Sequence, residues 1–210
     1  MKRLNTFKSS MLAGICIGIA GWGYLATMNI IGGILFAFGL LAVVNYRLAL
    51  YTGTAGFIKF RNNNGHLTPT PSAGLLLFIL FGNIIGCLLV ALLARVSPLD
   101  ICASAQTILE GRLNTGFWQC GLLAIGCGFI MTTIVTFARQ NKPLIMFFGI
   151  PLFIICGFPH CVADAFYYLA VPLDYMLGHW TEVALLYPSI VLGNFIGCNI
   201  YRLVMRGNPE

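Results

Sequence analysis

Apolar residues along this chain are grouped in six long runs, which shorter polar segments separate. The runs cover about residues 9–27, 29–60, 71–95, 116–137, 143–170 and 183–203. Each run is near or above the roughly 20 residues that a helix needs to cross the hydrocarbon core of a bilayer. The pattern therefore predicts an all-α, polytopic membrane protein, in which residues 1–210 form a single transmembrane domain of six helices.

Two of these runs, 29–60 and 143–170, contain polar residues together with glycine or proline. The segment 157–164 is the most informative, because it places His160 and Asp164 in apolar surroundings. Ionisable side chains at membrane depth are costly and are usually kept for function. Irregular backbone at that depth is tolerated where it is buried in protein or lines a cavity. We therefore interpret this segment as a site in a permeation path.

If both helices break near the midplane, one second half starts near Thr52 and Gly53 and the other near His160 and Cys161. A helix start exposes unpaired N–H groups and carries about half a positive charge. Two starts that face each other attract a small anion without a fixed buried charge. The His160 imidazole and the Thr52 hydroxyl add hydrogen-bonding groups to the same place.

Each of these residues also has a purely structural interpretation. His160 would tie two helices together, and Thr52 would bond back to its own helix. The break beside Pro159 favours a pore role for the histidine. For Asn83 and Asn194 we favour interhelical hydrogen bonding and loop support over direct contact with an anion.

A six-residue motif occurs in both halves of the chain, as Gly82-Asn83-Ile84-Ile85-Gly86-Cys87 and again as Gly193-Asn194-Phe195-Ile196-Gly197-Cys198. Glycine is common in packed membrane helices, so an accidental match is the alternative, but an asparagine at the same register in both copies favours a true repeat. With three spans in each half, the second half crosses the membrane in the opposite direction. We therefore expect a 3+3 inverted repeat, with halves at about 9–95 and 116–203 and a substrate path at broken helices two and five.

Lysine and arginine residues are distributed unequally between the two sides of the membrane. With both termini on one side, that side holds Lys2, Arg3, Lys8, Lys59, Arg61, Arg139, Lys142, Arg202 and Arg206, and the other holds only Arg95 and Arg112. This asymmetry predicts that both termini are cytoplasmic. We expect the protein in a bacterial-type inner membrane. The three tryptophans, Trp22, Trp118 and Trp180, fall at the outer ends of their spans, as an interfacial aromatic belt requires.

The composition excludes several other classes of protein. The chain is 59% hydrophobic and 9% charged, whereas a soluble domain carries roughly 25% charged residues. The net charge of +6 does not indicate nucleic-acid binding, because the charges lie at span ends and not on one face. The eight cysteines include no C-x-x-C pair and indicate neither disulfides nor zinc. We therefore expect no metal and no other cofactor.

Three segments resemble the signatures of the formate/nitrite transporter family. They are Gly157–Asp164, which fits GF-x-H-[SC]-x-A-[ND], Leu50–Gly53, which fits L-[FY]-T-[SG], and Gly193–Gly197, which fits GN-x-IG. The resemblance covers nearly the whole chain, in order and with matching spacing. The segment around His160 is specific to this family, whereas the glycine–asparagine pieces alone would not identify it.

The resemblance implies an aquaporin-like protomer of six helices, assembled as a homopentamer with a pore in each protomer. It implies these pore residues: His160 at the centre with Thr52 as its partner, Leu40, Leu50 and Tyr51 at the cytoplasmic constriction, and Phe36 and Phe153 at the periplasmic one. The family passes formate, nitrite, hydrosulfide and related monovalent anions. Formate is therefore the expected substrate.

The sequence also departs from the family pattern. Pro159 replaces the usual glutamate, Asp164 the usual asparagine and Arg112 the usual periplasmic lysine, and Arg47-Leu48-Ala49 replaces G-A-[DE]. A lone Asp164 would repel an anion, so one hypothesis pairs it with Arg47. In the alternative, Arg47 points to the cytoplasmic interface, and Asp164 is protonated or capped by helix N–H groups. The desolvation cost of a buried ion pair leaves both open.

Three functional classes account for some part of this sequence. The first is a channel for a small monovalent anion, with formate as the expected substrate and nitrite or hydrosulfide as alternatives. The second is an intramembrane metal site or enzyme at His160 and Asp164, which are spaced i, i+4. It lacks further ligands at that depth, since we expect His66 and His179 in loops on opposite sides. The third, a neutral-solute channel, needs paired Asn-Pro-Ala turns, which the sequence lacks. We therefore expect an anion channel and not an enzyme.

Overall fold

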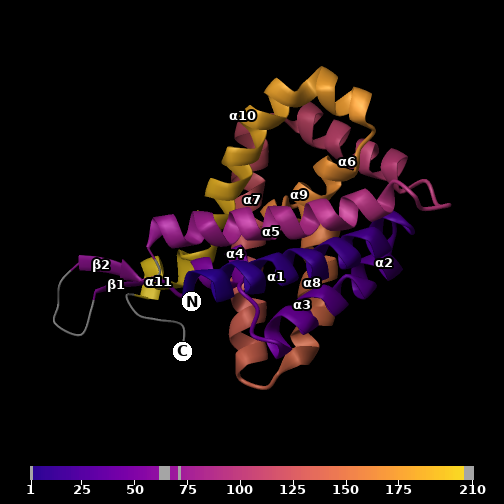
Figure 1. Cartoon of the computed structure of the whole chain (residues 1–210). Coiled ribbons are helices and arrows are strands. Elements are labelled where there is room, and N and C mark those ends of the chain that lie inside the picture. Colours follow the sequence, from indigo (N-terminus) through magenta and orange to yellow (C-terminus); the bar gives the residue numbers. More distant parts are fainter. Residues whose placement is uncertain (1, 62–66, 71, 206–210) are drawn as a thin grey trace.

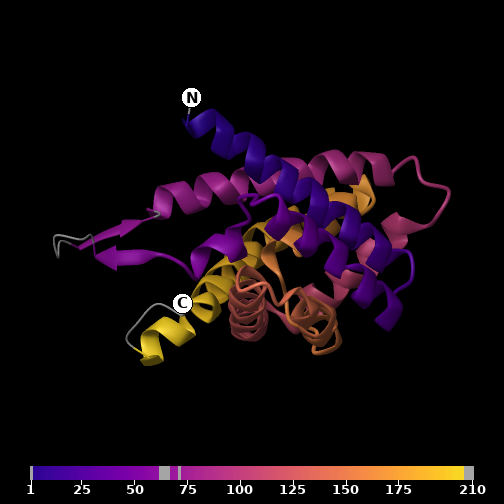
Figure 2. The ribbon, with the colours of Figure 1, turned by 90° about the horizontal axis from the view of Figure 1, so that it is seen from below.

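The computed structural model of the protein describes residues 2–61, 67–70 and 72–205. The helices are α1 (Lys2–Leu25), α2 (Ile30–Leu35), α3 (Ala37–Asn45), α4 (Tyr51–Ala55), α5 (Ala73–Ala94), α6 (Ile101–Thr115), α7 (Phe117–Arg139), a 3₁₀ turn (Pro143–Ile145), α8 (Met146–Ile155), α9 (Cys161–Ala170), α10 (Leu173–Cys198) and α11 (Ile200–Met205). Strands β1 (Lys59–Arg61) and β2 (Leu67–Thr70) form an antiparallel hairpin between α4 and α5. The hairpin projects from the helical body in both Figure 1 and Figure 2.

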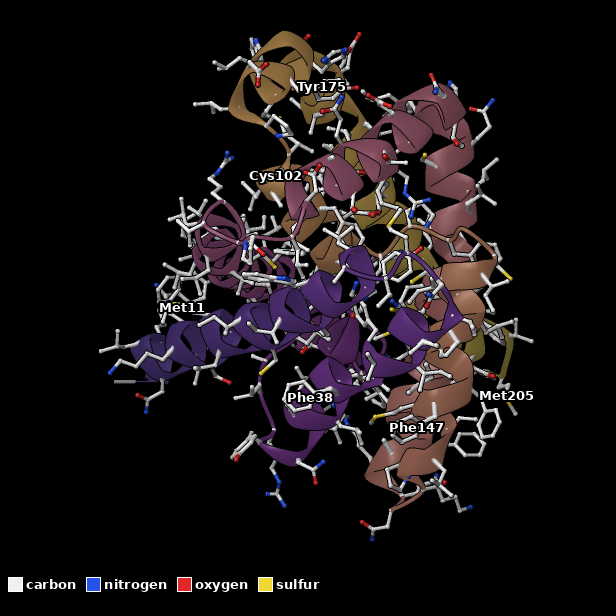
Figure 3. All side chains as sticks on the ribbon, turned by 90° about the vertical axis from the view of Figure 1, so that its right-hand side faces the viewer. Met11, Phe38, Cys102, Phe147, Tyr175 and Met205 are labelled. Atoms are coloured by element: carbon white, nitrogen blue, oxygen red, sulfur yellow. The ribbon has the colours of Figure 1, made fainter. Side chains whose placement is uncertain are left out.

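Several helices have the length and composition of membrane spans. In the described part of the chain, Ala73–Ala94, Phe117–Arg139 and Leu173–Met205 are long and apolar enough to cross a bilayer, and shorter apolar helices cover Ile30–Asn45, Pro143–Ile155 and Cys161–Ala170. Large apolar side chains such as Phe38 and Phe147 are exposed and lie at the periphery of the molecule (Figure 3). Many large apolar side chains exposed in this way suit lipid and not water. The chain is therefore an all-α, multi-pass membrane protein.

Two segments differ from what hydrophobicity predicted. Residues 101–115, expected as a loop, form α6, and Asp100 caps this helix by accepting the Ala103 N–H at 3.3 Å. Helix α10 begins at Leu173, before the expected start of the sixth span, so His179 lies in a helix and not in a loop. Both segments are helical but not strongly apolar, so hydrophobicity alone did not identify them as helices. His66 lies outside the described residues.

Helices α1 and α5 pack along each other, and α7 and α10 pack in the same way (Figure 1). A Cβ added to Gly86 on α5 would overlap the carbonyl oxygen of Met11 on α1. A Cβ added to Gly197 on α10 would overlap the carbonyl oxygen of Ile125 on α7. Only a residue without a side chain lets two helix backbones come so close. These two glycines of the repeated motif therefore set the spacing within each helix pair.

Replacing Gly197 with alanine is expected to lower the unfolding temperature of the detergent-solubilised protein. The added methyl group forces α7 and α10 apart, and overpacking of this kind costs about 1–3 kcal/mol. Gly178→Ala on the same helix is the matched control, because its Cβ would meet no atom within 4 Å. It is expected to leave stability unchanged or to raise it by up to about 1 kcal/mol. Equal unfolding temperatures for the two variants would argue against the close approach of α7 and α10.

Helices α3 and α8 end in the same way, with a Schellman motif around a residue of positive φ. That residue is Arg47 (φ 53°) after α3 and Gly157 (φ 67°) after α8. The backbone hydrogen bonds run from Arg47 N–H to Val44 O (3.1 Å) and Leu48 N–H to Val43 O (2.8 Å), and from Gly157 N–H to Ile154 O (3.0 Å) and Phe158 N–H to Phe153 O (2.9 Å). Both helices therefore stop at a defined residue and do not fray.

The chain then runs through an extended residue and starts a new helix. Leu50 (φ −99°, ψ 137°) precedes α4, and His160 (φ −117°, ψ 112°) precedes α9. Both residues are buried. Residues 29–60 are thus divided among α2, α3 and α4, and residues 143–170 among the 3₁₀ turn, α8 and α9. As a result, α4 and α9 begin inside the protein.

Candidate functional site

Helices α4 and α9 begin beside each other. Thr52, in the first turn of α4, and His160, the N-cap residue of α9, place Oγ1 and Nε2 3.0 Å apart. Their exposed fractions are 0% and 2%. Two helix starts that are far apart in the sequence therefore bring a hydroxyl group and an imidazole into contact in the interior.

The tautomer of His160 follows from its second hydrogen bond. Its Nδ1 accepts the backbone N–H of Ala163 at 3.1 Å, which is an N-cap interaction. A nitrogen that accepts carries no proton in the neutral ring, so Nε2 carries it and donates to Thr52 Oγ1. The Thr52 hydroxyl accepts this bond and keeps its own hydrogen, which it can donate to a ligand.

Two buried asparagines, Asn83 on α5 and Asn194 on α10, hold the two helix starts in the same way. In each case Oδ1 accepts the first backbone N–H of the new helix, and Nδ2 donates to two carbonyl groups, one just before that helix and one on the neighbouring long helix. The partners are Tyr51 (2.9 Å), Ala49 (2.9 Å) and Ser10 (2.8 Å) for Asn83, and Cys161 (2.8 Å), Pro159 (2.9 Å) and Ala124 (2.8 Å) for Asn194. Both amide hydrogens of each side chain are thus engaged by the protein.

Two cysteines connect each helix start to the opposite helix pair. The Cys87 thiol on α5 donates to the Val162 carbonyl of α9 at 3.4 Å, and the Cys198 thiol on α10 donates to the Thr52 carbonyl of α4 at 3.6 Å. Sequence reasoning used the cysteines only to argue against disulfides and zinc, and it missed these contacts. Their position at the end of both copies of the repeated motif was the available signal.

Apolar side chains surround this centre. Phe153 on α8 stacks on the His160 ring with centroids 5.8 Å apart, and it meets the Phe36 ring edge-on at 6.2 Å. Leu40 on α3 and Leu50 before α4 are both buried. The structure therefore groups Phe36 with Phe153 beside the histidine, and their role in a periplasmic constriction stays a prediction.

Tyr51 lies against α10. Its hydroxyl donates to the Val191 carbonyl at 3.4 Å, and its ring lines a cavity between α5 and α10. Its expected place in a constriction with Leu40 and Leu50 stays a prediction.

A cavity of about 380 Å³ reaches His160 from the side of α6. Arg112 of α6 and Asp164 of α9 share its lining with Phe153. Helix α6 and the connection between α7 and α8 lie at opposite ends of the molecule (Figure 1). Figure 3 shows the same separation, with Cys102 of α6 near one end and Phe147 of α8 near the other. The cavity therefore opens one side of the site.

Arg112 and Asp164 form an ion pair in this cavity. Arg112 Nε lies 3.5 Å from Asp164 Oδ1, and its Nη1 donates to the Gly157 carbonyl at 2.6 Å. The Asp164 side chain is buried, and neither carboxylate oxygen accepts a hydrogen bond from a described residue. Burial lowers the pKa of Arg112, but Asp164 together with the neighbouring Tyr168, Cys120 and Tyr167 more than offsets this, so the pKa is raised. The guanidinium therefore stays charged at physiological pH.

Arg47 lies outside the cavity that Arg112 and Asp164 line. Its side chain is exposed and lines a second cavity of about 520 Å³, together with Gly53, Arg139 and Asn141. The hypothesis that Arg47 pairs with Asp164 is therefore wrong, because Asp164 has Arg112 as its partner. The sequence had left this pairing open beside an alternative, and neither interpretation named Arg112, which lies on a separate helix.

Arg139 is a further residue of the second cavity that the sequence did not single out. Its Nη2 donates to the Gly53 carbonyl at 3.1 Å, and its guanidinium lies 3.8 Å from the centroid of the Phe57 ring. The residue thereby connects the end of α7 to α4. Sequence reasoning counted it only as a charge at the end of a span, because nothing local shows which helix a terminal arginine will contact.

No three His, Cys, Asp or Glu side chains in the described parts of the chain are placed to hold a metal ion.

The sequence matches the family described as Formate/nitrite transporter over residues 1–206. It is 27% identical to the formate channel BtFdhC of Bacillus thuringiensis over 187 residues, which cover 84% of this chain and 70% of that protein. It is 26% identical to the formate channel FocA of Haemophilus influenzae over 198 residues, which cover 84% of this chain and 68% of that one.

Two solved structures share the fold. A pentameric formate channel with formate bound superposes with a TM-score of 0.80 at 19% identity, covering 98% of this chain and 96% of the other. An ion channel of the FNT family superposes with a TM-score of 0.71 at 21% identity, covering 97% and 89%. The helical arrangement described above is therefore that of a known class of membrane channel.

Proposed function

This chain belongs to the formate/nitrite transporter family, and from that premise we propose that it conducts formate through a pore within each protomer. It is a transport protein and not an enzyme. The contact between Thr52 and His160 at two buried helix starts is the observation that carries the proposal. Relatives that are formate channels favour formate over nitrite and hydrosulfide, which are the alternative substrates.

The Thr52–His160 centre has the properties of a resting place for a small anion. Positive partial charge accumulates where helices start, and α4 and α9 both start here. The Thr52 hydroxyl keeps a hydrogen to donate, and His160 is the central pore residue. No fixed charge sits at the centre, so the anion is held by dipoles and hydrogen bonds and can leave again.

We further propose that the protomer is a 3+3 inverted repeat, with halves at about 9–95 and 116–203 and with helices two and five broken. Four features occur once in each half and support this. They are the close helix pairs α1–α5 and α7–α10, the two Schellman motifs, the hydrogen bonds of Asn83 and Asn194 to the starts of α4 and α9, and the thiol contacts of Cys87 and Cys198. Accidental similarity in glycine content does not produce the same hydrogen-bonding partners in both halves. The substrate site then lies where the two halves meet.

The proposed path has a cavity with charged residues at each end and a narrow apolar centre. We propose that the path runs from the cavity with Arg112 and Asp164, which Phe153 and His160 also line, to the cavity with Arg47 and Arg139. Phe36, Leu40, Leu50 and Tyr51, all buried, would line the apolar stretch between them. Moving a bare anion into an apolar constriction is costly. A weak acid avoids this cost when a proton neutralises it where the path is driest, and it then crosses uncharged.

We place the protomer in a homopentamer in a bacterial-type inner membrane, with both termini in the cytoplasm and the bilayer around the apolar exterior. A solved structure of the same fold is a pentameric formate channel. The excess of lysine and arginine on the side of the termini supports the orientation. The cavity containing Arg112 is then periplasmic, and the cavity containing Arg139 is cytoplasmic.

Flux assays in proteoliposomes test this function. Formate, nitrite, hydrosulfide and acetate are compared at two pH values, with protein-free liposomes as the background. Formate is expected to cross fastest and acetate, which is larger, most slowly, and formate flux is expected to be higher at the lower pH, where more of the acid is neutral. A protein that passes none of the four above background, or passes glycerol faster than formate, would contradict the proposal.

A further inference from the structure

The ion pair between Arg112 and Asp164 is incompletely bonded for buried charges. The carboxylate lies 3.5 Å from Arg112 Nε, yet no described residue donates a hydrogen bond to either of its oxygens, and Arg112 Nε donates none. Buried carboxylates ordinarily accept several hydrogen bonds. Both groups line the cavity that leads to His160. The spare bonding capacity therefore faces the space through which a ligand arrives.

We propose that Asp164 binds a proton when Arg112 binds the anion, so that the cavity is loaded with one proton and one anion together. In the unloaded state, the Asp164 carboxylate is itself the anion that Arg112 holds. On loading, an O–H bond forms on the Asp164 carboxylate, and the Arg112 guanidinium pairs with the carboxylate of formate in place of that of Asp164. No other covalent bond changes, and the net charge of the two side chains with their ligands is zero before and after. This inference rests on the proposed function, since it concerns the same pore.

Electrostatics favour this exchange over the binding of either ion alone. A formate ion added to the intact pair leaves one net negative charge in a buried cavity. A proton added alone leaves the Arg112 guanidinium without a counter-ion. An uncompensated buried charge is strongly unfavourable in either case. Uptake of both ions is the route that keeps the cavity neutral.

Arg112 is the one charged group that faces Asp164 among the described residues. Several titratable side chains surround the pair. They are Tyr24 of α1, Cys120 and Cys127 of α7, Tyr187 of α10, and Cys161, Tyr167 and Tyr168 of α9 itself, with His160 one turn earlier. Phenols and thiols are ordinarily neutral near pH 7. Arg95 instead binds the carbonyls of Leu169 and Val171 at the far end of α9.

The position of Asp164 also connects loading to the next step. His160 precedes it by four residues, so the two side chains lie on the same side of the start of α9 and line one cavity. Return of the proton from Asp164 to formate breaks the O–H bond on Asp164, forms one on formate, and restores the ion pair with Arg112. Neutral formic acid is then released beside Phe153 and His160, where an uncharged molecule passes apolar side chains more easily.

Proton uptake on formate binding tests this inference directly. The purified, full-length protein is held in detergent at low buffer concentration with a pH indicator, and sodium formate at the same pH is added. The wild-type protein is expected to take up about one proton per formate bound, because binding is linked to protonation of Asp164. Asp164→Asn is expected to take up almost none. Asp174→Asn, an exposed aspartate in the first turn of α10, is the matched control and should behave as wild type.

Transport of charge in proteoliposomes gives a second readout. Formate uptake by the wild type is expected to be insensitive to membrane potential, whereas an inside-negative potential should slow Asp164→Asn. Formate binding by the wild type without proton uptake would overturn the inference and leave the proposed function standing, even if the variant failed to fold. Equal proton uptake by wild type and Asp164→Asn would do the same. If the wild type neither binds nor passes formate, nitrite or hydrosulfide, both proposals are wrong.

Discussion

Replacing His160 with alanine is expected to lower formate flux in proteoliposomes by between about tenfold and a hundredfold. A hydrogen bond to a charged group is worth about 1.5–3 kcal/mol, and 1.4 kcal/mol corresponds to about a tenfold change. The substitution removes the partner of Thr52 Oγ1 and the ring that stacks on Phe153. Formate flux of the variant is compared with that of the wild type between about pH 5 and 8.

Two control variants distinguish an effect on folding from an effect on conduction. His160→Asn keeps a side-chain acceptor for the Ala163 N–H at the start of α9, because asparagine is a good N-cap residue. It is therefore expected to fold as the wild type does while still losing flux. His179→Ala removes a histidine on α10 that contacts Tyr175 and lies outside the pore. Wild-type flux for His160→Ala across that pH range would remove the histidine from the mechanism.

Replacing Asn194 with alanine is expected to destabilise the protein by several kcal/mol and to abolish most of the flux. The change leaves the Cys161 N–H and the carbonyls of Ala124 and Pro159 without their partner. Each buried group left unsatisfied costs about 1–3 kcal/mol. The start of α9 then loses its position, and His160 moves with it. Unfolding in detergent and formate flux measure the two effects.

Asn83→Ala is the internal comparison for this variant. Asn83 makes the same set of hydrogen bonds at the start of α4, so a similar loss of stability is expected if the two halves are a true repeat. Asn45→Ala is the control, because Asn45 is exposed and bonds only to the Leu41 carbonyl of its own helix. Its effect should stay within about 0.5 kcal/mol. A stable, fully conducting Asn194→Ala protein would show that the asparagines do not position the helix starts.

The parts of the fold that sequence predicted are those with a local signal. Apolar runs of sufficient length gave the membrane helices, and Gly157 with Pro159 marked the interruption before α9. The interruption before α4 has no such marker at its turning point, since Arg47 occupies the left-handed position that glycine usually takes. The left-handed conformation of a residue with a side chain costs roughly 1–2 kcal/mol, and the surrounding hydrogen bonds must offset this cost.

Long-range pairings were the least predictable part of the site. Thr52 and His160 were placed at two helix starts by their motifs, and the structure brings them into contact. Of the two interpretations left open for Asp164, the pairing with Arg47 was wrong, because Arg112 reaches Asp164 from α6. Residues 101–115 are not strongly apolar, so hydrophobicity did not predict this helix. Charge alone suggests that a buried carboxylate has a cationic partner, but only the packing of α6 on α9 shows which one.

An experimental structure of the full-length protein in the presence of formate tests the central claim most directly. The bound anion is expected at the start of α4 and α9, with an oxygen within about 3.2 Å of the Thr52 hydroxyl or the His160 ring. Formate found only in the cavity beside Arg112, or unbroken helices through residues 45–51 and 155–161, would contradict the account.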